Sequence, residues 1–230
     1  MGYLIEPAAT IGSAGEAASA LSAAFIHIGA LLLASPQPNQ GEATFDHVAS
    51  YLGSRMVKIT GFDHELVTVP GRDWDRGEVE TNLRQVEVLV HALRTEFLSP
   101  SVAIRVNPTQ QPGYDAAGEL SGRPWVLEAF GGARITNNDK LAYDLQSLCG
   151  CGEQTKLLAF RKRAWTLQGT LTDKWNSFAT TARKTRSQAG FKAIASVRQV
   201  AYLNDIVLAE ARDITITPSK RDSDTSAVEG

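Results

Sequence analysis

The feature that most constrains this chain is a pair of strand-like runs, residues 113–120 and 125–130, separated by the four residues Ser121-Gly122-Arg123-Pro124. Ser121-Gly122 is a short hairpin turn signal, so the two runs are predicted to be antiparallel strands. A turn at these residues places Asp115 opposite Glu128 on one face of the sheet, with their Cβ atoms ~5 Å apart. The fold must therefore accommodate two carboxylates side by side.

Opposed carboxylates repel each other unless a cation lies between them. Arg123, at the turn end of the hairpin, is poorly placed to supply that charge. The arrangement suits Mg²⁺, a hard ion that takes one or two protein carboxylates together with water and phosphate oxygens. Two plainer interpretations stay open. One is that Asp115 only caps the turn before its strand, and the other is that Glu128 forms an ordinary ion pair with Arg134 or Lys140.

The segments around the hairpin predict a mixed α/β order. An apolar stripe with spacings of four and three predicts a long helix over residues 77–97. Alternation predicts a strand over 102–106, and a capped apolar pattern predicts a helix that opens near Asp139-Lys140 and runs to about 148. Residues 156–160 form an apolar strand. Residues 77–161 therefore read as helix, three strands, helix and strand.

Residues 1–76 are predicted to form an N-terminal helical extension, with helices over 16–34 and 45–53, followed by a strand over 64–69 and a turn over 70–73. The uncharged run from Ala17 is almost long enough to span a bilayer. It is rich in Ala and Ser, however, and it lacks flanking cations and aromatic belts. A buried helix or a dimer contact is therefore expected there, not a membrane span.

The C-terminal part of the chain concentrates positive charge. Ten Lys or Arg residues and one acidic residue lie between Lys156 and Val200, although the whole chain has a net charge of −2. Such a concentration suggests a polyanion as partner, and a solvated face that aids solubility is the alternative. Residues 162–216 are predicted to form a basic region packed on the core, with a helix over 171–188, followed by a disordered tail over 217–230. The candidate nucleic-acid-binding residues are Arg161, Lys162, Arg163, Lys174, Arg183, Lys184 and Arg186.

Length and cysteine content limit the class of protein. A chain of 230 residues suffices for one large domain, or for a domain with a helical extension. Cys149 and Cys151 are too few for a disulfide framework and too close for an easy bridge, which favours a reducing cytoplasm. The four histidines show no zinc-ligand spacing.

The element order, with Asp at the start of the second strand and Glu on the third, resembles the PD-(D/E)XK nuclease superfamily and its restriction-endonuclease-like fold. Gly113-Tyr114-Asp115 stands where the Pro-Asp element of the family would be. Glu128-Ala129-Phe130 stands where Glu-x-Lys would be, so Phe130 occupies the lysine position. Some members carry this lysine on the following helix, which Lys140 matches, and Arg134 is a weaker candidate.

The resemblance implies a Mg²⁺-dependent DNA endonuclease of restriction type. Asp115, Glu128 and Lys140 would be the catalytic residues. Asp115, Glu128 and the Ala129 carbonyl would hold the metal. Double-stranded DNA would be the substrate, and the protein would act as a homodimer whose interface includes the helix at 16–34.

Two other functions remain open at this level. One is a non-catalytic nucleic-acid-binding or assembly subunit on the same fold, with Asp115 and Glu128 in structural pairs. The other is an unrelated α/β protein whose basic segment faces an acidic protein partner. Three further acids bear on the choice. Glu119 is either a third site acid or the exposed end of the hairpin, and Glu80 and Glu87 are expected on a solvated flank of the long helix.

Overall fold

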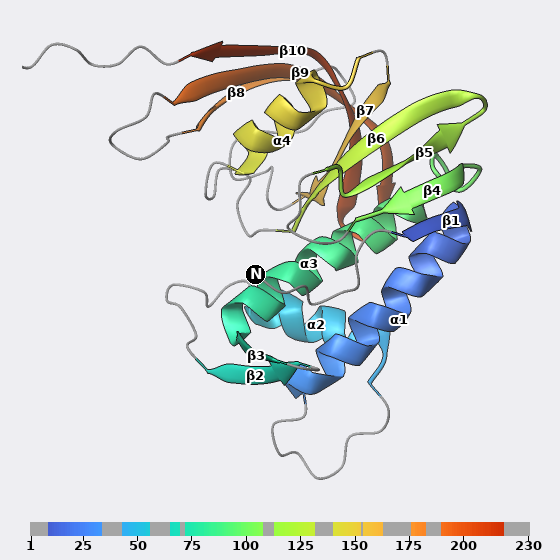
Figure 1. The fold of residues 1–230 in the computed structure, drawn as a ribbon, viewed down its shortest axis with the longest axis vertical. Helices are drawn as coiled ribbons and strands as arrows, with labels where there is room; N and C mark the ends of the chain where they lie inside the picture. The colour runs from blue at the N-terminus through green and yellow to red at the C-terminus, as the bar shows by residue number, and fades with distance from the viewer. Residues whose placement is uncertain are drawn as a thin grey trace, which may run out of the picture.

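The computed structural model describes residues 9–33, 43–55, 65–69, 72–107, 113–131, 140–152, 154–162, 176–182 and 190–218. It is a mixed α/β structure built on one eight-stranded sheet with the strand order β1-β4-β5-β6-β7-β10-β9-β8 (Figure 1). The predicted α/β class is therefore confirmed. The sheet takes strands from the N-terminal, central and C-terminal segments.

The central segment has the predicted order of elements. It consists of α3 (Arg76–Leu93), β4 (Val102–Val106), β5 (Ala116–Leu120), β6 (Arg123–Phe130), α4 (Lys140–Cys149) and β7 (Thr155–Arg161). Strands β4, β5 and β6 are antiparallel neighbours, whereas β7 pairs with β6 in parallel. Helix α4 is thus the crossover between two parallel strands, as parallel pairing requires. Helix α3 ends at Leu93, four residues before the predicted end at residue 97, and turns follow it.

The predicted hairpin and its register are confirmed. Strands β5 and β6 pair Ala116 with Leu127 and Leu120 with Arg123, which places Asp115 and Glu128 at the next opposed position. The two turn residues have positive φ angles, 51° at Ser121 and 77° at Gly122. Both values suit a type I′ turn, whose twist matches that of the flanking strands.

The N-terminal segment is less purely helical than predicted. Helices α1 (Ala14–Leu33) and α2 (Phe45–Arg55) are present, and the strand predicted over residues 64–69 is present as β2 (Leu66–Val69). Its hairpin partner β3 (Arg72–Asp75) and the strand β1 (Ala9–Ser13) were not predicted. Strand β1 pairs with β4 and forms one edge of the large sheet. A five-residue strand next to a long helix carries too short an alternation to be recognised from sequence.

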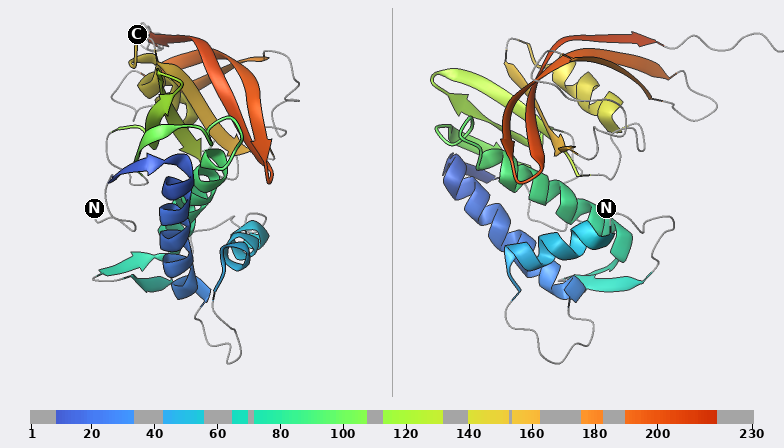
Figure 2. Two further views of the ribbon diagram at one scale, coloured as in Figure 1. Left: turned by 90° about the vertical axis from the view of Figure 1, so that its right-hand side faces the viewer. Right: turned by 180° about the vertical axis from the view of Figure 1, so that it is seen from behind.

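Helix α1 packs along α3, and the two helices cross the same side of the sheet in the views of Figure 2. Within the described ranges, α1 is the helix long and apolar enough to span a membrane, a property that core helices share. Its face with Leu21, Phe25, Ile28 and Leu32 is buried in the core.

The predicted basic helical region at the C-terminus is wrong. Strand β8 (Asn176–Ala182) lies inside the range predicted as a helix, and β9 (Phe191–Leu203) and β10 (Ile206–Pro218) form a long antiparallel hairpin. From residue 191 to 197, buried and more exposed residues alternate, which is the period of a strand. The exposed position 194 holds an apolar isoleucine, and the buried positions 193 and 195 hold only alanine, so the apolar alternation is weak in the sequence. The predicted tail begins inside β10, and residues 219–230 lie outside the described ranges.

Two hydrophobic clusters cover the two faces of the sheet. The first joins α1, α2 and α3 to the sheet, and the second joins α4 to β9 and β10. Strand β6 contributes Leu127 and Ala129 to the first cluster and Val126 and Phe130 to the second. Glu128 therefore belongs to the face that α4 covers, because alternate residues of a strand share a face.

Candidate metal and catalytic site

Asp115 lies at the start of β5 and is 5 % exposed. Its two carboxylate oxygens are held by different elements. Gln85 Nε2 on α3 donates to Oδ1 at 2.6 Å, and the Ala129 backbone N–H on β6 donates to Oδ2 at 2.6 Å. The side chain is thus fixed between a helix and a strand, which is more than a local turn cap provides.

The approach of α3 to the end of β6 depends on Gly131. A Cβ atom at this residue would lie 2.3 Å from the backbone nitrogen of Gln85 and 2.5 Å from the carbonyl carbon of Arg84. Atoms that are not bonded to each other do not approach this closely, so a side chain at residue 131 would push α3 away from β6. Glycine at position 131 allows the contact between Gln85 and Asp115.

Glu128 is also 5 % exposed and faces α4. Burial, and then the nearby charges of Asp115 and Asp144, raise the pKa of Glu128 to about 9, while Lys140 and a hydrogen bond with Ser147 oppose the shift. A side-chain hydrogen bond also links Glu128 with Asp115, whose pKa is raised by burial. The predicted juxtaposition of the two carboxyl groups is confirmed. Without a bound cation, the pair holds a proton well above neutral pH.

Lys140 is the first residue of α4, as expected for a lysine placed on the following helix. Its Nζ atom lies 2.9 Å and 3.1 Å from the two carboxylate oxygens of Asp144. Burial disfavours the charge of Lys140, but Asp144, Asp115 and Glu128 outweigh this effect and raise the pKa of Lys140 above its usual value. The structure therefore brings Lys140 into the electrostatic field of both predicted acids.

One side of α4 supplies the polar groups that meet the hairpin. Lys140, Asp144 and Ser147 are spaced four and three residues apart, so they share one helix face. Asp144 is 6 % exposed, and burial raises its pKa to about 6, with Lys140 acting in the opposite direction. Asp115, Glu128, Lys140 and Asp144 are called the carboxylate site below. The site contains three acidic side chains and one basic side chain.

This donor set fits a magnesium ion better than a softer metal. Within the part of the chain that the structure describes, no group of three or more His, Cys, Asp or Glu residues has the geometry to hold a metal ion alone. A site of two carboxylates and a backbone carbonyl, completed by water and substrate oxygens, matches what Mg²⁺ takes in proteins. The charges of Asp115 and Asp144 add to burial in raising the pKa of Glu128, and a cation bound beside these acids would offset their repulsion.

Phe130, in the usual lysine position of the family pattern, is part of the second hydrophobic cluster. It is 3 % exposed, and Leu141 and Leu145 of α4 belong to the same cluster. A lysine at this position would put an ammonium group into apolar packing. Arg134, the weaker lysine substitute, lies outside the described residues.

The expectation that Glu80 and Glu87 lie on a solvated flank is wrong. Both are buried in α3. Glu80 Oε1 lies 3.4 Å from Arg76 Nε, Glu80 Oε2 lies 3.7 Å from Arg84 Nη2, and Glu87 pairs with Arg161 of β7. The same helix also carries Gln85 to the carboxylate site, so its polar residues are divided between two buried clusters. Glu119, in contrast, is exposed at the far end of the hairpin.

The predicted nucleic-acid contacts fall into three groups. Arg161 is buried in its ion pair with Glu87, so its charge is already matched inside the protein. Lys162 is exposed, and its ammonium lies 5.5 Å from the centre of the Tyr202 ring. The other five candidates lie outside the described residues: Arg163, Lys174, Arg183, Lys184 and Arg186.

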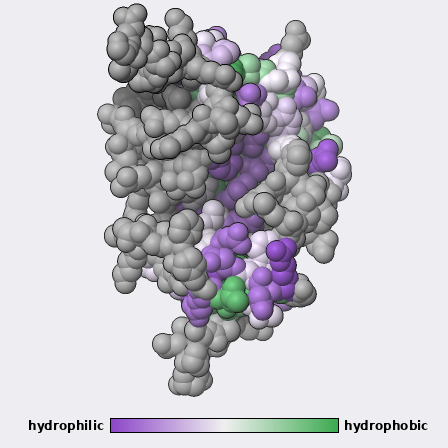
Figure 3. Space-filling view, turned by 60° about the vertical axis from the view of Figure 1, so that its left-hand side comes forward, coloured by the Kyte–Doolittle hydropathy of each residue, from purple (hydrophilic) through white to green (hydrophobic). Residues whose placement is uncertain are grey.

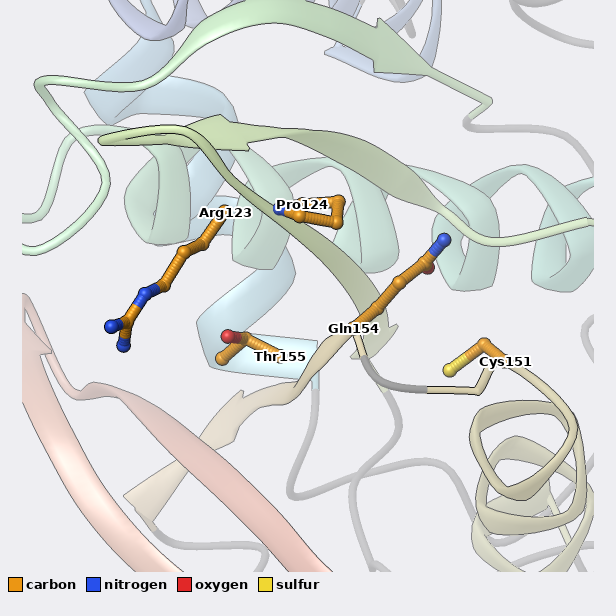
Figure 4. Close-up of a pocket in the computed structure, with 5 residues that line it drawn as sticks. All are labelled: Arg123, Pro124, Cys151, Gln154 and Thr155. Atoms are coloured by element: carbon orange, nitrogen blue, oxygen red, sulfur yellow. The ribbon is translucent and has the colours of Figure 1, made fainter.

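A surface pocket lies at the opposite end of β6 from Glu128. Arg123, Pro124, Cys151, Gln154 and Thr155 line it (Figure 4). In the close-up, the Arg123 and Gln154 side chains extend in different directions and do not converge on one point. The predicted packing role fits Cys151, whose Sγ lies 2.8 Å from the Leu148 carbonyl oxygen at the end of α4. The pocket and the carboxylate site are separate features.

Among the described residues, the large apolar side chains that are exposed are Leu66, Val102, Tyr143, Ile194 and Tyr202. On the face in Figure 3, hydrophilic side chains predominate among the coloured residues.

Sequence reasoning missed Gln85, Asp144 and Ser147. A signal for Asp144 was available, because it follows Lys140 by four residues and interrupts the apolar pattern of its helix. No local pattern distinguishes Gln85 from the other polar residues of α3. Its role depends on the tertiary approach at Gly131.

No family model, no curated protein and no solved structure gives a significant match to this chain.

Proposed function

We propose that this protein is a Mg²⁺-dependent DNA endonuclease of restriction type, with a restriction-endonuclease-like core formed by α3, β4, β5, β6, α4 and β7. One observation carries the proposal. Two buried carboxyl groups, Asp115 and Glu128, lie side by side, and in the described residues neither has a Lys, Arg or His within ion-pair distance. Buried acids are normally paired with a cation or bound to a metal.

Asp115, Glu128 and the Ala129 carbonyl would hold the ion. When bound, Mg²⁺ lowers the pKa of a coordinated water and neutralises charge on the phosphate under attack. The chain supplies the orientation of its own ligands, since Gln85 and the Ala129 N–H fix the Asp115 carboxylate. Residues behind a ligand that fix it in this way usually matter almost as much as the ligand itself.

Lys140 would provide the positive charge that a transferring phosphate requires. Its position at the start of α4, within the field of Asp115 and Glu128, suits a role in orienting the attacking water or stabilising developing negative charge. Its raised pKa keeps the ammonium protonated at neutral pH.

Duplex DNA is the proposed substrate because the basic residues between positions 156 and 198, apart from the buried Arg161 and the ion-paired Arg198, would neutralise backbone phosphates. Lys162 is the described candidate that is exposed for this role. Affinity would then fall steeply as the salt concentration rises. A two-fold homodimer in a reducing cytoplasm remains part of the proposal, but the apolar face of α1 that suggested the interface is buried in the core.

A non-catalytic nucleic-acid-binding subunit on the same fold is the second candidate. It is favoured by two observations: Phe130 fills the usual lysine position, and the ion pair of Lys140 is made with Asp144. This reading predicts DNA binding that does not depend on Asp115, Glu128 or Mg²⁺.

The test is incubation of the purified protein with supercoiled plasmid and with mixed-sequence linear DNA, in Mg²⁺ and in EDTA. Glu128→Ala is the active-site variant, and Glu119→Ala, an exposed acid on the same hairpin, is its matched control. Discrete fragments that require Mg²⁺, survive Glu119→Ala and vanish in Glu128→Ala are expected. DNA that is bound but stays intact across several sequences would favour the non-catalytic subunit, and the absence of both cleavage and binding would reject both candidates.

A further inference from the structure

Asp144 binds the ammonium of Lys140, the positive charge that would otherwise neutralise Asp115 and Glu128. Lys140 is the first residue of α4, and both oxygens of Asp144 contact its ammonium, at 2.9 Å and 3.1 Å. Glu128 and Asp115 also attract Lys140, but Asp144 is the strongest of the three attractions. The side chain of Lys140 thus has three acids to choose from and is held by the one on its own helix.

A pair of this kind adds little stability when it is exposed to solvent. The carboxylate of Asp144 is instead buried against the site, where removing a charge from water is costly and must be offset by its partner. An exposed pair one turn along the helix would have stabilised α4 without that cost. The burial of Asp144 beside two further acids therefore needs an explanation other than helix stability.

We propose that Asp144 is a positioning residue that holds the Lys140 ammonium away from the Asp115–Glu128 pair, and so keeps that pair open for a divalent cation. The inference rests on the proposed function, because it assigns the pair to metal binding. The inference adds to that function a competition between Lys140 and the metal for the two carboxylates, which Asp144 prevents.

Removal of the Asp144 carboxylate has a defined consequence in this geometry. An Asn side chain retains the size of Asp but has no charge to hold the ammonium. Asp115 and Glu128 are then the remaining acids among the described residues that act on Lys140. The ammonium would move to them and take the place of the cation.

The test is calorimetric titration of Mn²⁺, used as the probe metal, at pH 7.5 into the wild type, Asp144→Asn, Lys140→Ala and the double variant. We expect Asp144→Asn to weaken Mn²⁺ binding about 10-fold or more when Lys140 is present, as for other residues that orient a metal site. With Lys140→Ala as background, the same change should cost less than about 3-fold, because sites that act through one another are not additive. Asp144→Glu should retain most of the affinity.

Equal weakening in both backgrounds would overturn the inference, because Asp144 would then act through its own charge or as a ligand. Unchanged binding in Asp144→Asn, or no Mn²⁺ binding to the wild type, would also overturn it. Lys140→Met provides a second test if Asp144→Asn does not fold. Its Mn²⁺ affinity should equal or exceed that of the wild type, and a fall of about 10-fold would contradict the competition.

DNA cleavage by the same proteins separates this inference from the proposed function. Coupled Mn²⁺ binding without cleavage by the wild type would support the role of Asp144 and reject the nuclease. Cleavage by the wild type with independent effects of Lys140 and Asp144 on Mn²⁺ binding would support the nuclease and reject the role of Asp144.

Discussion

Helix α3 contributes to two buried clusters of charged residues, and the clusters differ in the ratio of acidic to basic side chains. On one part of α3, Glu80 lies between Arg76 and Arg84, and Glu87 pairs with Arg161, so each buried acid has a guanidinium partner. The carboxylate site, which α3 contacts through Gln85, has three acids and a single lysine. The α3 ion pairs are completed by the chain itself, whereas the carboxylate site has an excess of negative charge.

This difference indicates which cluster is structural. Guanidinium groups suit buried pairing because they are planar, always charged and weakly hydrated. Burial raises the pKa of Glu87, but the facing charge of Arg161 opposes that shift. At Glu128, the charges of Asp115 and Asp144 add to the effect of burial. The site is therefore arranged at the expense of stability, as is common where a chain binds a ligand or catalyses a reaction.

The largest effect is expected from breaking an α3 ion pair. Glu87→Ala leaves Arg161 buried and unpaired, which should lower the free energy of unfolding by about 3–5 kcal/mol. Urea unfolding at pH 7 measures this loss, with Glu119→Ala as an exposed control that should be nearly neutral. A loss below about 1 kcal/mol would show that this pair is not a completed structural unit.

The carboxylate site should show the opposite behaviour, because its acids destabilise the metal-free fold. Between about pH 4.5 and pH 9, folded Glu128 keeps a proton that the unfolded chain has released. The stability of the metal-free protein should therefore fall as the pH rises through this window, by an amount on the order of a few kcal/mol. Thermal unfolding in EDTA at pH 5, 7 and 9 measures the trend.

Glu128→Gln carries no such proton, so its stability should vary less with pH over the same range. Mg²⁺ should restore stability to the wild type at pH 8 and have little effect on Glu128→Gln. Parallel pH profiles for the two proteins would contradict the assignment of the excess charge to Glu128.

Gly131 links the two clusters, because it sets the distance between β6 and α3. In Gly131→Ala, the new Cβ would overlap the backbone at Gln85, and we expect a loss of about 1–3 kcal/mol in urea unfolding. Gly150→Ala is the matched control, since its Cβ would lie 3.5 Å from the Ser147 carbonyl oxygen, an ordinary contact. Equal stability of the two variants would mean that the approach is not tight.

The smallest effect on folding, but a clear effect on metal binding, is expected at Gln85. Gln85→Leu removes the donor to Asp115 Oδ1 and should weaken Mg²⁺ binding about 10-fold to 100-fold with a small change in melting temperature. Thr81→Ala, at an exposed position one turn earlier on α3, is the control. Unchanged affinity in Gln85→Leu would show that the Ala129 N–H alone fixes Asp115.

The sequence predicts most of the central segment because its signals are local. The turn at Ser121-Gly122 determines the register of the hairpin, and that register places Asp115 beside Glu128. The contribution of Gln85 is not local, because it depends on how α3 packs against the end of β6. The prediction failed in the C-terminal part, where the exposed Ile194 and the small buried residues Ala193 and Ala195 weaken the alternation of β9.

The prediction that Glu80 and Glu87 of α3 face solvent also failed, for a related reason. Glutamates spaced along a helix usually face solvent, and nothing near Glu87 in the sequence announces its partner Arg161 on β7. The sequence shows which residues are charged but not which of them are buried, since the partner of a buried acid can come from any element that packs nearby.

The most direct test of the account is calorimetric titration of Mg²⁺ into the wild type, Glu128→Gln and Glu119→Gln at pH 7.5. The account predicts one saturable site per chain, with release of protons from the carboxylate site, in the wild type and in Glu119→Gln. Glu128→Gln should lose this binding while it remains folded. Absence of Mg²⁺ binding to the wild type at millimolar concentrations, or the same binding in Glu128→Gln, would contradict the claim that the excess of buried acid is a cation site.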